Sequence, residues 1–329
     1  MRRACITGGA GFIGSNLAER LRASGVEVAI VDDFRTGRRE FVSELLAGSG
    51  AELYEGDVLD NALLERAFEG CDWVFHMQAN ADVRHGLKHP QRDLEQNTIA
   101  TATVLEAMRA VGTTRIAFAS TGSIYGEPDV FPTPEDAPFP VQTSLYGASK
   151  LAGEGMIAAY CHGYGFGAVA FRFVSILGER YTHGHVYDFY RALKRDPQRL
   201  RVLGDGRQEK SYLYVQDCVG AMLTAVASHA GDGDGEFGVY NLGNDETVPL
   251  EQSVRTITAH MGLEPELEYG GGRRGWPGDS PLINLDCSRI RALGWVPTLT
   301  IQESIVRTLE WLDANPYASL AAPADVVPR

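Results

Sequence analysis

Short apolar runs alternate with segments of helical spacing along the first third of this chain. The apolar runs cover residues 4–7, 27–31, 52–55 and 73–76, and the helical segments cover residues 12–22, 39–46, 62–68 and 94–110. Strands that are apolar on both faces are typical of a parallel sheet covered by helices on both sides. Because crossovers between parallel strands are right-handed, the alternation predicts a doubly wound α/β fold.

The alternation continues beyond residue 110 but is interrupted twice. We expect a strand at 115–120, a proline-rich connection at 127–140, a helix at 146–160, and strands at 168–174 and 239–242. These elements predict a main Rossmann-type domain from residues 1–177 and about 205–243. Residues from about 178–204 and 244–315, with the glycine-rich stretch 270–278, are expected to form a smaller, discontinuous C-terminal substrate lobe. Residues 316–329 are expected to be a flexible tail.

Charge and cysteine content argue against several classes of protein. With 30 basic and 43 acidic residues the formal net charge is −13, and the basic residues are scattered, which argues against a nucleic-acid partner. No apolar run reaches the roughly 18 residues of a membrane span, and glycines interrupt the apolar stretch near the N-terminus, unlike in a signal peptide. We therefore expect a cytoplasmic protein without a membrane partner. The five cysteines lie far apart, which predicts buried free thiols and neither a disulfide framework nor a metal site.

Three glycines follow the first expected strand at the GxxGxxG spacing, at Gly8, Gly11 and Gly14. The missing side chains let the backbone approach a pyrophosphate closely. The helix that opens at Phe12 and Ile13 supplies free amides and the positive end of a dipole. The motif therefore predicts a Rossmann-type dinucleotide site, with a simple tight turn as the alternative.

Polar residues end the next three expected strands. Asp32 is placed to accept the ribose hydroxyls of NAD and to repel the extra phosphate of NADP. Asp57 and Val58 are candidates to contact the adenine, although a turn or helix-capping role for Asp57 is an equal alternative. His76 and Gln78 end the fourth strand, at the edge where ligands bind in such sheets. A neutral, packed His76 fits equally well.

Tyr146 and Lys150 open a helical segment one turn apart, so both side chains share one face. A nearby ammonium favours a phenolate, which predicts that Lys150 lowers the pKa of Tyr146 from its normal value of about 10 and makes it a base. Thr121 follows the strand at 115–120, where its hydroxyl is placed to bind the reacting oxygen. Tyrosine and lysine also occur at this spacing by chance, so the interpretation depends on the glycine motif upstream.

Five motifs together resemble one family over nearly the whole chain. They are TGGAGFIG (7–14), STGSIYGE (120–127), YGASK (146–150), GDGRQEKSYLYVQD (204–217) and NLG (241–243). The chain is thereby similar to the extended short-chain dehydrogenases/reductases, which include NAD-dependent epimerases and dehydratases, and most similar to UDP-glucose 4-epimerases. The resemblance implies NAD as cofactor and a homodimer packed through the helices at 94–110 and 146–160.

The same resemblance assigns roles by position. The catalytic hydroxyl falls on Thr121, the base on Tyr146, and the lysine that also binds the ribose of NAD on Lys150. Ser123 falls against the sugar, and Asn97 falls on a helix position that supports the cofactor site. In the implied reaction the sugar 4-hydroxyl loses a proton and a hydride, and the 4-keto sugar rotates and receives the hydride on its other face. NAD then stays bound between turnovers.

The two positions that follow Thr121 differ between enzymes of the family that catalyse different reactions. Dehydratases carry Asp and Glu there and decarboxylases commonly carry Glu at the second, whereas this chain has Gly122 and Ser123. The resemblance therefore favours 4-epimerisation of a UDP-hexose or UDP-hexuronate. One alternative is a nucleotide-sugar dehydratase, decarboxylase or net oxidoreductase that uses the same three residues, and another is a non-catalytic NAD-binding protein.

The substrate side departs from the epimerase pattern. Ser175 stands in place of an asparagine, and Lys210 in place of an arginine that grips the diphosphate; an ammonium lacks the bidentate fork of a guanidinium. Arg273 or Arg274, shortly before Asp279, is expected to compensate. Solvated surface charges are the alternative for Lys210 and Arg274.

Ile283, four positions after the loop aspartate, falls where related epimerases form a wall of the sugar pocket. A stiff β-branched side chain there is expected to exclude N-acetylated sugars, with an ordinary core position as the alternative. The segment 181–185 carries two histidines that match no motif of the family. Without a third ligand nearby, we expect no metal site there.

Overall fold

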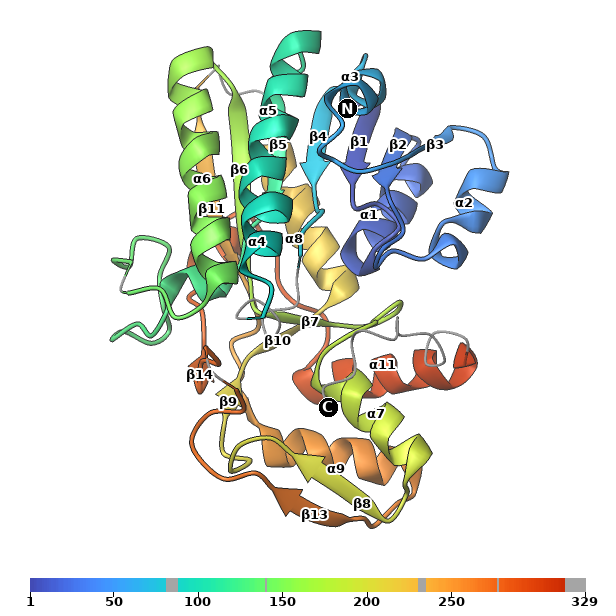
Figure 1. The fold of residues 1–329 in the computed structure, drawn as a ribbon, viewed down its shortest axis with the longest axis vertical. Helices are drawn as coiled ribbons and strands as arrows, with labels where there is room; N and C mark the ends of the chain where they lie inside the picture. The colour runs from blue at the N-terminus through green and yellow to red at the C-terminus, as the bar shows by residue number, and fades with distance from the viewer. Residues whose placement is uncertain (81–87, 140, 230–234, 277, 317–329) are drawn as a thin grey trace.

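The computed structural model describes residues 1–80, 88–139, 141–229, 235–276 and 278–316. Its main feature is a parallel sheet in the order β11-β6-β5-β4-β1-β2-β3, shown in Figure 1. The strands are β1 (Arg3–Thr7), β2 (Glu27–Asp32), β3 (Ala51–Glu55), β4 (Trp73–His76), β5 (Arg115–Ala119), β6 (Gly167–Phe173) and β11 (Phe237–Leu242). The predicted doubly wound α/β fold is confirmed. The expected tail falls almost entirely outside the described residues.

Helices cover both faces of this sheet, which explains why its central strands β1, β4 and β5 are mainly apolar and buried. Side chains alternate between the faces: Cys5 packs with the first group of helices, whereas Ile6 packs with the second. The first group consists of α3 (Asn61–Phe68), α5 (Ala100–Val111) and α6 (Leu145–Tyr164), and the second of α1 (Phe12–Ala23) and α8 (Val215–Ser228). The sheet is therefore the buried middle layer of three.

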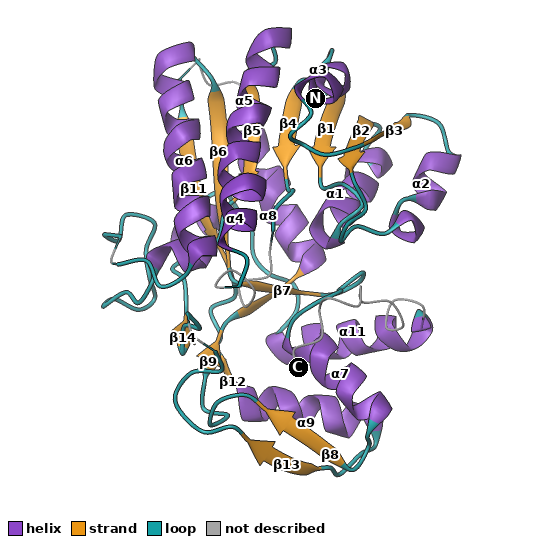
Figure 2. Ribbon diagram, in the orientation of Figure 1, coloured by secondary structure: helices purple, strands orange, loops and turns teal. Residues whose placement is uncertain are grey.

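A smaller part of the molecule lies below the sheet in Figures 1 and 2. Its strands form three small sheets: β7 (Ser175–Leu177) with β10 (Tyr212–Tyr214); β8 (Arg199–Val202) with β13 (Glu266–Tyr269); and β9 (Glu209–Lys210) with β12 (Val248–Pro249) and β14 (Leu282–Ile283). Its helices are α7 (His185–Arg195), α9 (Leu250–Met261) and α11 (Ile301–Ala314), whereas α10 (Ser288–Ala292) packs against α8 and β11. One hydrophobic core runs from Ile6 in the large sheet to Leu200, Val254 and Ile305 in this part.

Two predicted helices have a different form. The segment 39–46 divides at Val42, whose φ of −122° is not helical, into a 3-10 turn η1 (Arg39–Phe41) and α2 (Ser43–Ala47). The segment 94–110 begins as a π-helical turn η2 (Leu94–Ile99) and continues as α5, and a short helix α4 (Pro90–Asp93) precedes it. Such π turns are frequent at functional sites. Within the described part of the chain, no helix is long and apolar enough to cross a membrane.

Candidate functional site

The candidate site lies at the carboxyl edge of the large sheet, where the strand order reverses. The chain builds β2 and β3 on one side of β1 and then places β4 and β5 on the other. Ligands of open parallel sheets bind at such a reversal because the loops on its two sides diverge. The loops that follow β1, β2, β4 and β5 carry most of the residues predicted from the sequence.

The glycine loop after β1 leaves room for a bound diphosphate. Gly8 has a φ of +68°, and a Cβ on Gly14 would lie 2.2 Å from the Gly8 carbonyl oxygen, so neither position accepts a side chain. Gly11 is the N-cap of α1, its first turn contains no acidic residue, and no side chain caps it. The amides of that turn, which includes Phe12 and Ile13, are thus available to an anion. These residues fit the phosphates of a dinucleotide.

Asp32 joins the glycine loop to the loop after β2. One carboxylate oxygen accepts from the Ala10 amide and the other from the Phe34 amide, each at 2.9 Å. Burial raises the pKa of Asp32, while both amide hydrogen bonds oppose that rise. Each oxygen keeps a lone pair beyond these bonds. The carboxylate therefore fits the ribose hydroxyls of a bound dinucleotide.

The candidate residues at the ends of β3 and β4 interact mainly with other groups of the protein. Asp57 accepts from the Leu59 amide at 3.0 Å and pairs with Arg35 at 2.7 Å, as expected for the turn alternative. Val58 is buried beside it. His76 is fully buried between Thr7 and Thr101, and burial lowers its pKa to about 3. It is a neutral, packed strand residue, whereas the partly buried Gln78 follows it at the sheet edge.

Thr121 and Tyr146 meet where β5 ends and α6 begins. Thr121 caps the turn η3 (Gly122–Tyr125) by accepting from the Ser123 amide at 3.1 Å. Ser144 caps α6 in the same way and fixes the backbone just before Tyr146. The Thr121 hydroxyl lies close enough to the Tyr146 hydroxyl to lower the pKa of Tyr146. The structure therefore brings the predicted hydroxyl and the predicted base together.

Lys150 lies one turn further along α6 and is only 1% exposed. A Cβ on Gly153 would lie 2.8 Å from the Phe118 ring, so helix and sheet approach closely there, and the Lys150 ammonium lies 4.7 Å from the centre of that ring. Burial lowers the pKa of Lys150 to about 7, and the Glu154 carboxylate raises it. The amine is thus close to half protonated near neutral pH.

In the protein without ligands, Lys150 does not lower the pKa of Tyr146 as the sequence predicted. Burial raises the pKa of Tyr146 to about 12, against the hydrogen bond from Thr121, which lowers it. The sequence argument considered only the charge of the neighbouring lysine and not the desolvation of both groups. This expectation was therefore wrong for the protein without ligands.

Asn97 supports the start of α6 from the π-helical turn η2. Its amide donates to Ser149 Oγ at 2.9 Å, and its carbonyl oxygen accepts from the Asn80 amide at 2.8 Å. Ser149 in turn donates to the Tyr146 carbonyl at 2.8 Å. Asn97 is therefore one contact removed from the predicted base.

The predicted substrate residues gather around a short ion pair in the smaller part. Lys210 Nζ lies 2.5 Å from Asp279 Oδ1 and 5.1 Å from the centre of the Trp276 ring. Arg274 donates to the Asp279 carbonyl at 2.9 Å and pairs with Glu127. Lys210 is thus already paired with a carboxylate of the protein, that of Asp279.

The remaining candidates on this side differ in their surroundings. Ile283 is the register partner of Lys210 between β14 and β9, and it packs partly against the core. Ser175 is exposed beside Tyr212 at the start of β7, and Arg273 is exposed. His185, in the segment without an assigned role, packs against Tyr212 with the ring centres 4.7 Å apart and the rings tilted by 42°. The structure therefore brings Ile283 next to Lys210 of the ion pair.

Two charged residues beside the site were not predicted. Glu154 and Arg172 are both at least 95% buried and pair with each other. Glu154 follows Lys150 by one helical turn, so the spacing of Tyr146, Lys150 and Glu154 already places all three on one face. Arg172 interrupts the otherwise apolar strand β6, and a charge at such a position is rarely buried without a partner.

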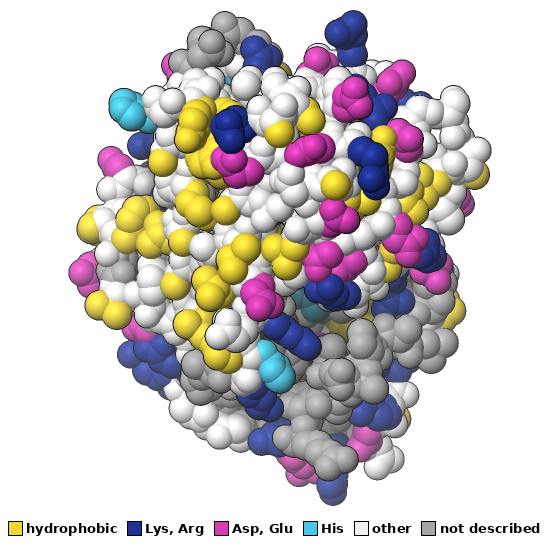
Figure 3. Space-filling model, turned by 45° about the horizontal axis from the view of Figure 1, so that its top comes forward, with side chains coloured by type: hydrophobic (Ala, Val, Ile, Leu, Met, Phe, Trp, Pro, Cys, Tyr) yellow, Lys and Arg dark blue, Asp and Glu magenta, His cyan; other side chains and the backbone are white. Residues whose placement is uncertain are grey.

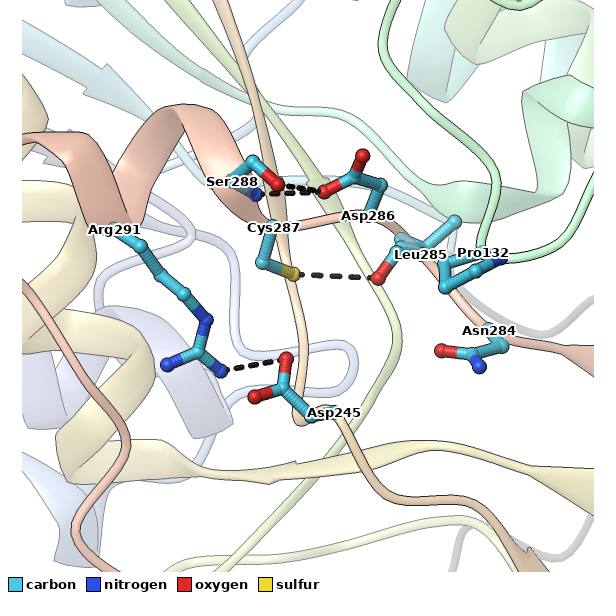
Figure 4. A pocket seen from close by; sticks show the side chains of 8 residues that line it. All are labelled: Pro132, Asp245, Asn284, Leu285, Asp286, Cys287, Ser288 and Arg291. Atoms are coloured by element: carbon cyan, nitrogen blue, oxygen red, sulfur yellow. Dashed lines mark hydrogen bonds and ion pairs between the residues drawn. The ribbon is translucent and has the colours of Figure 1, made fainter.

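A separate pocket of about 290 Å³ lies near α10, as Figure 4 shows. It is lined by Pro132, Asp245, Asn284, Leu285, Asp286, Cys287, Ser288 and Arg291. Arg291 is already paired with Asp245 at 2.8 Å. None of the predicted site residues lines this pocket, so it is distinct from the candidate site.

Comparison with known proteins identifies the family. The model of the NAD dependent epimerase/dehydratase family matches residues 4–243. The chain belongs to this family. The match spans the glycine loop, Asp32 and the Thr121, Tyr146 and Lys150 constellation, and membership in an NAD-dependent family confirms NAD as the predicted cofactor.

Similar members of the epimerase/dehydratase family include UDP-sugar 4-epimerases. A crystal structure of UDP-galactose 4-epimerase is 38% identical with a TM-score of 0.85, covering 95% of this chain and 99% of that one. UDP-glucose 4-epimerase of Thermus thermophilus, solved in complex with NAD, is 33% identical with a TM-score of 0.82, covering 94% and 99%. UDP-glucose 4-epimerase of Corynebacterium glutamicum is 31% identical, covering 92% of both chains. UDP-glucuronic acid decarboxylase 1 of Danio rerio is also similar, at 28% identity over 94% of this chain and 72% of that one.

Proposed function

We propose that this protein interconverts the 4-epimers of a UDP-hexose or UDP-hexuronate through a transient 4-keto sugar. The observation that carries the proposal is the contact between Thr121 and Tyr146, with Lys150 one turn away and no carboxylate at the two positions after Thr121. Hydroxyl groups suffice to move the proton of a sugar 4-hydroxyl. Elimination of water requires a further acid.

In the proposed reaction the protein handles the proton, and bound NAD supplies a hydride acceptor and donor. Tyr146 Oη takes the proton of the 4-hydroxyl, while Thr121 Oγ binds the same sugar oxygen. Lys150 binds the ribose of the cofactor and favours the tyrosinate by its charge. In the second half, Tyr146 returns the proton to the oxygen of the turned sugar. Net oxidation is zero, so no added cofactor is consumed.

The surroundings of Gly122 support epimerisation over dehydration. A Cβ on Gly122 would lie 3.1 Å from the Phe173 carbonyl oxygen and 3.4 Å from the Leu285 side chain. An aspartate at this position would therefore force the backbone around it to shift. Ser123, the next residue, has only a hydroxyl to offer. The similarity to a decarboxylase keeps a lyase as the second candidate.

We propose that NAD is held by the loops at the sheet reversal. Gly8, Gly11 and Gly14 with the first turn of α1 receive the diphosphate, and Asp32 receives the adenosine ribose. Asp57, Val58 and Gln78 flank the adenine side and the strand end, and Asn97 holds the backbone at Tyr146 through Ser149. Lys210, Arg274 and Asp279 form the candidate diphosphate site of the substrate, and Ser123, Ser175 and Ile283 face the sugar or its linkage.

Incubation of purified protein with UDP-hexoses and UDP-hexuronates, followed by proton NMR of the products, tests this function. We expect an equilibrium mixture of two 4-epimers and release of NAD only when the protein is denatured. Carbon dioxide or a dehydrated sugar as product would identify a lyase, and a stoichiometric need for added NAD would identify a net oxidoreductase. A lack of turnover with every sugar would point to a non-catalytic NAD-binding protein.

We also propose that two copies associate through η2, α5 and α6. Leu94, Ile99 and Leu145 are 41–47% exposed on this side. Figure 3 shows hydrophobic side chains gathered on the side of the molecule where α5 and α6 lie in Figure 1. Exposed apolar patches mark association surfaces. Light scattering at micromolar concentration should give twice the chain mass, and a mass of 35.8 kDa would contradict the proposal.

A further inference from the structure

A buried ion pair lies directly beside the proposed catalytic lysine. Arg172 Nε donates to Glu154 Oε1 at 3.1 Å and Arg172 Nη2 donates to Glu154 Oε2 at 2.7 Å, so the pair is bidentate. The side chains are 5% and 4% exposed. Breaking a pair of this kind leaves an uncompensated charge in a low dielectric. Glu154, one turn after Lys150, is thus a charged residue that is costly to bury, and the proposed proton transfer does not use it.

Each partner of the ion pair is held by further contacts. Ser120 Oγ donates to Glu154, which links the carboxylate to the residue before Thr121. Arg172 Nη1 donates to the Tyr125 hydroxyl and to the Glu135 carbonyl, both at 2.7 Å. The guanidinium also lies 5.0 Å from the centre of the Tyr125 ring and 5.2 Å from that of the Phe139 ring, and these two rings stack on each other. Glu154 therefore has a fixed place relative to both β5 and α6.

Among the residues that the structure describes, few charges other than that of Glu154 act on Lys150. From β4, His76 faces the lysine as a neutral ring, with both nitrogens engaged by threonine hydroxyls. From β5 comes only the apolar ring of Phe118. From α6 come Tyr146, which burial keeps neutral, and Glu154. Arg172 of β6 pairs with the Glu154 carboxylate, and its positive charge opposes that of Glu154.

We propose that Glu154 is a positioning residue for the reaction, whose fixed carboxylate keeps Lys150 protonated in a site that otherwise favours the neutral amine. Arg172 holds that carboxylate in place and limits its effect. The proposal rests on the proposed function for its link to turnover. Its electrostatic part concerns the protein alone.

The Lys150 ammonium can be observed directly because the chain contains only four lysines, at 88, 150, 194 and 210. In protein labelled with ¹³C at lysine Cε, NMR titration of the NAD-bound enzyme gives the protonation midpoint of each, and Lys150→Met assigns the signal. Glu154→Gln should lower the midpoint of Lys150 by about one pH unit, the lower end of the effect of a nearby opposite charge. Arg172→Gln should raise it. Opposite directions are expected because the two substitutions remove charges of opposite sign.

Two further variants keep the test decisive. Glu251→Gln removes an exposed carboxylate that is paired with Arg255 at 2.6 Å on α9, and it should leave the Lys150 midpoint unchanged. In the double variant with both Glu154→Gln and Arg172→Gln, neither member of the ion pair is left behind as an unpaired charge, so it should fold even if Glu154→Gln alone does not. Its Lys150 midpoint should again lie below that of the wild type. An unchanged midpoint in the double variant, or shifts in the same direction in both single variants, would overturn the proposal.

Kinetics separate this role from a structural one. Glu154→Gln should move the high-pH loss of kcat to lower pH by the same amount as the NMR midpoint, and so lower kcat about tenfold on that limb. A loss of kcat by the same factor at every pH would assign Glu154 a purely structural role. If no UDP-sugar is converted, the proposed function fails, but the NMR titration still decides the electrostatic proposal.

Discussion

Replacing Lys150 by methionine should stabilise the cofactor-free protein at neutral pH while it abolishes turnover. The lysine is 1% exposed, and burial lowers its pKa from 10.5 to about 7. A pKa that is lowered on folding means that the folded state disfavours the charged form. The resulting cost is absent above pH 10.5, grows as the pH falls, and is complete below pH 7.

One pKa unit corresponds to about 1.4 kcal/mol, so the cost to the free energy of unfolding is about 4 kcal/mol at pH 7 and about 2 kcal/mol at pH 9. Methionine has a similar unbranched shape and no charge to desolvate. Local relaxation and water penetration reduce such costs in real proteins, so we expect a gain on the order of 2–4 kcal/mol at pH 7. The gain should be about 2 kcal/mol smaller at pH 9.

Urea unfolding of the NAD-free wild type and variant at both pH values measures this difference. Lys194→Met is the matched control, because the Lys194 side chain is 56% exposed and pairs with Asp313 at 3.4 Å. Surface substitutions of this kind change stability by about 0.5 kcal/mol or less. The reasoning would be refuted if Lys150→Met were no more stable than the wild type at pH 7, or if its advantage were the same at pH 9.

Three further substitutions test the proposed site. Tyr146→Phe should lower kcat by about a hundred- to ten-thousand-fold with an unchanged unfolding midpoint, and near-native turnover would show that another group takes the proton. Asp32→Ala should weaken NAD binding and narrow the preference for NAD over NADP in calorimetric titrations. The control Asp33→Ala should leave both NAD binding and the preference for NAD unchanged. An unaltered preference in Asp32→Ala would show that the Asp32 carboxylate does not bind the ribose. Ile283→Gly should raise kcat/KM for UDP-N-acetylhexosamines relative to UDP-hexoses, with Leu282→Gly as control; a ratio unchanged from that of the wild type would make Ile283 a core residue.

The sequence indicated the large sheet well because its central strands are buried on both faces. The apolar runs at 4–7 and 73–76 have no polar face to obscure them, and the structure places them side by side in β1 and β4. The contact of Thr121 with Tyr146 followed from motifs at the ends of such elements. Assignment of residues to two lobes stays a prediction, as do the individual site roles.

The parts that escaped prediction depend on burial and on distant pairing. Lys210 and Asp279 are 69 positions apart, and nothing in either motif shows that they form an ion pair. The pKa of Tyr146 depends on how completely the fold covers it, which a spacing of four residues does not reveal. The role of Asp57 was ambiguous for a related reason, since a turn and a ligand contact use the same carboxylate.

The continuous hydrophobic core between the large sheet and the smaller part limits how substrate enters. A rigid-body hinge would pull apart packed side chains, such as those that join Ile6 to Leu200 and Ile305. Movement of the side chains around Asp279, whose carboxylate and carbonyl are held by Gly275 and Arg274, would leave that core intact. If a keto sugar forms at the proposed site, it turns over between walls that this core holds in place.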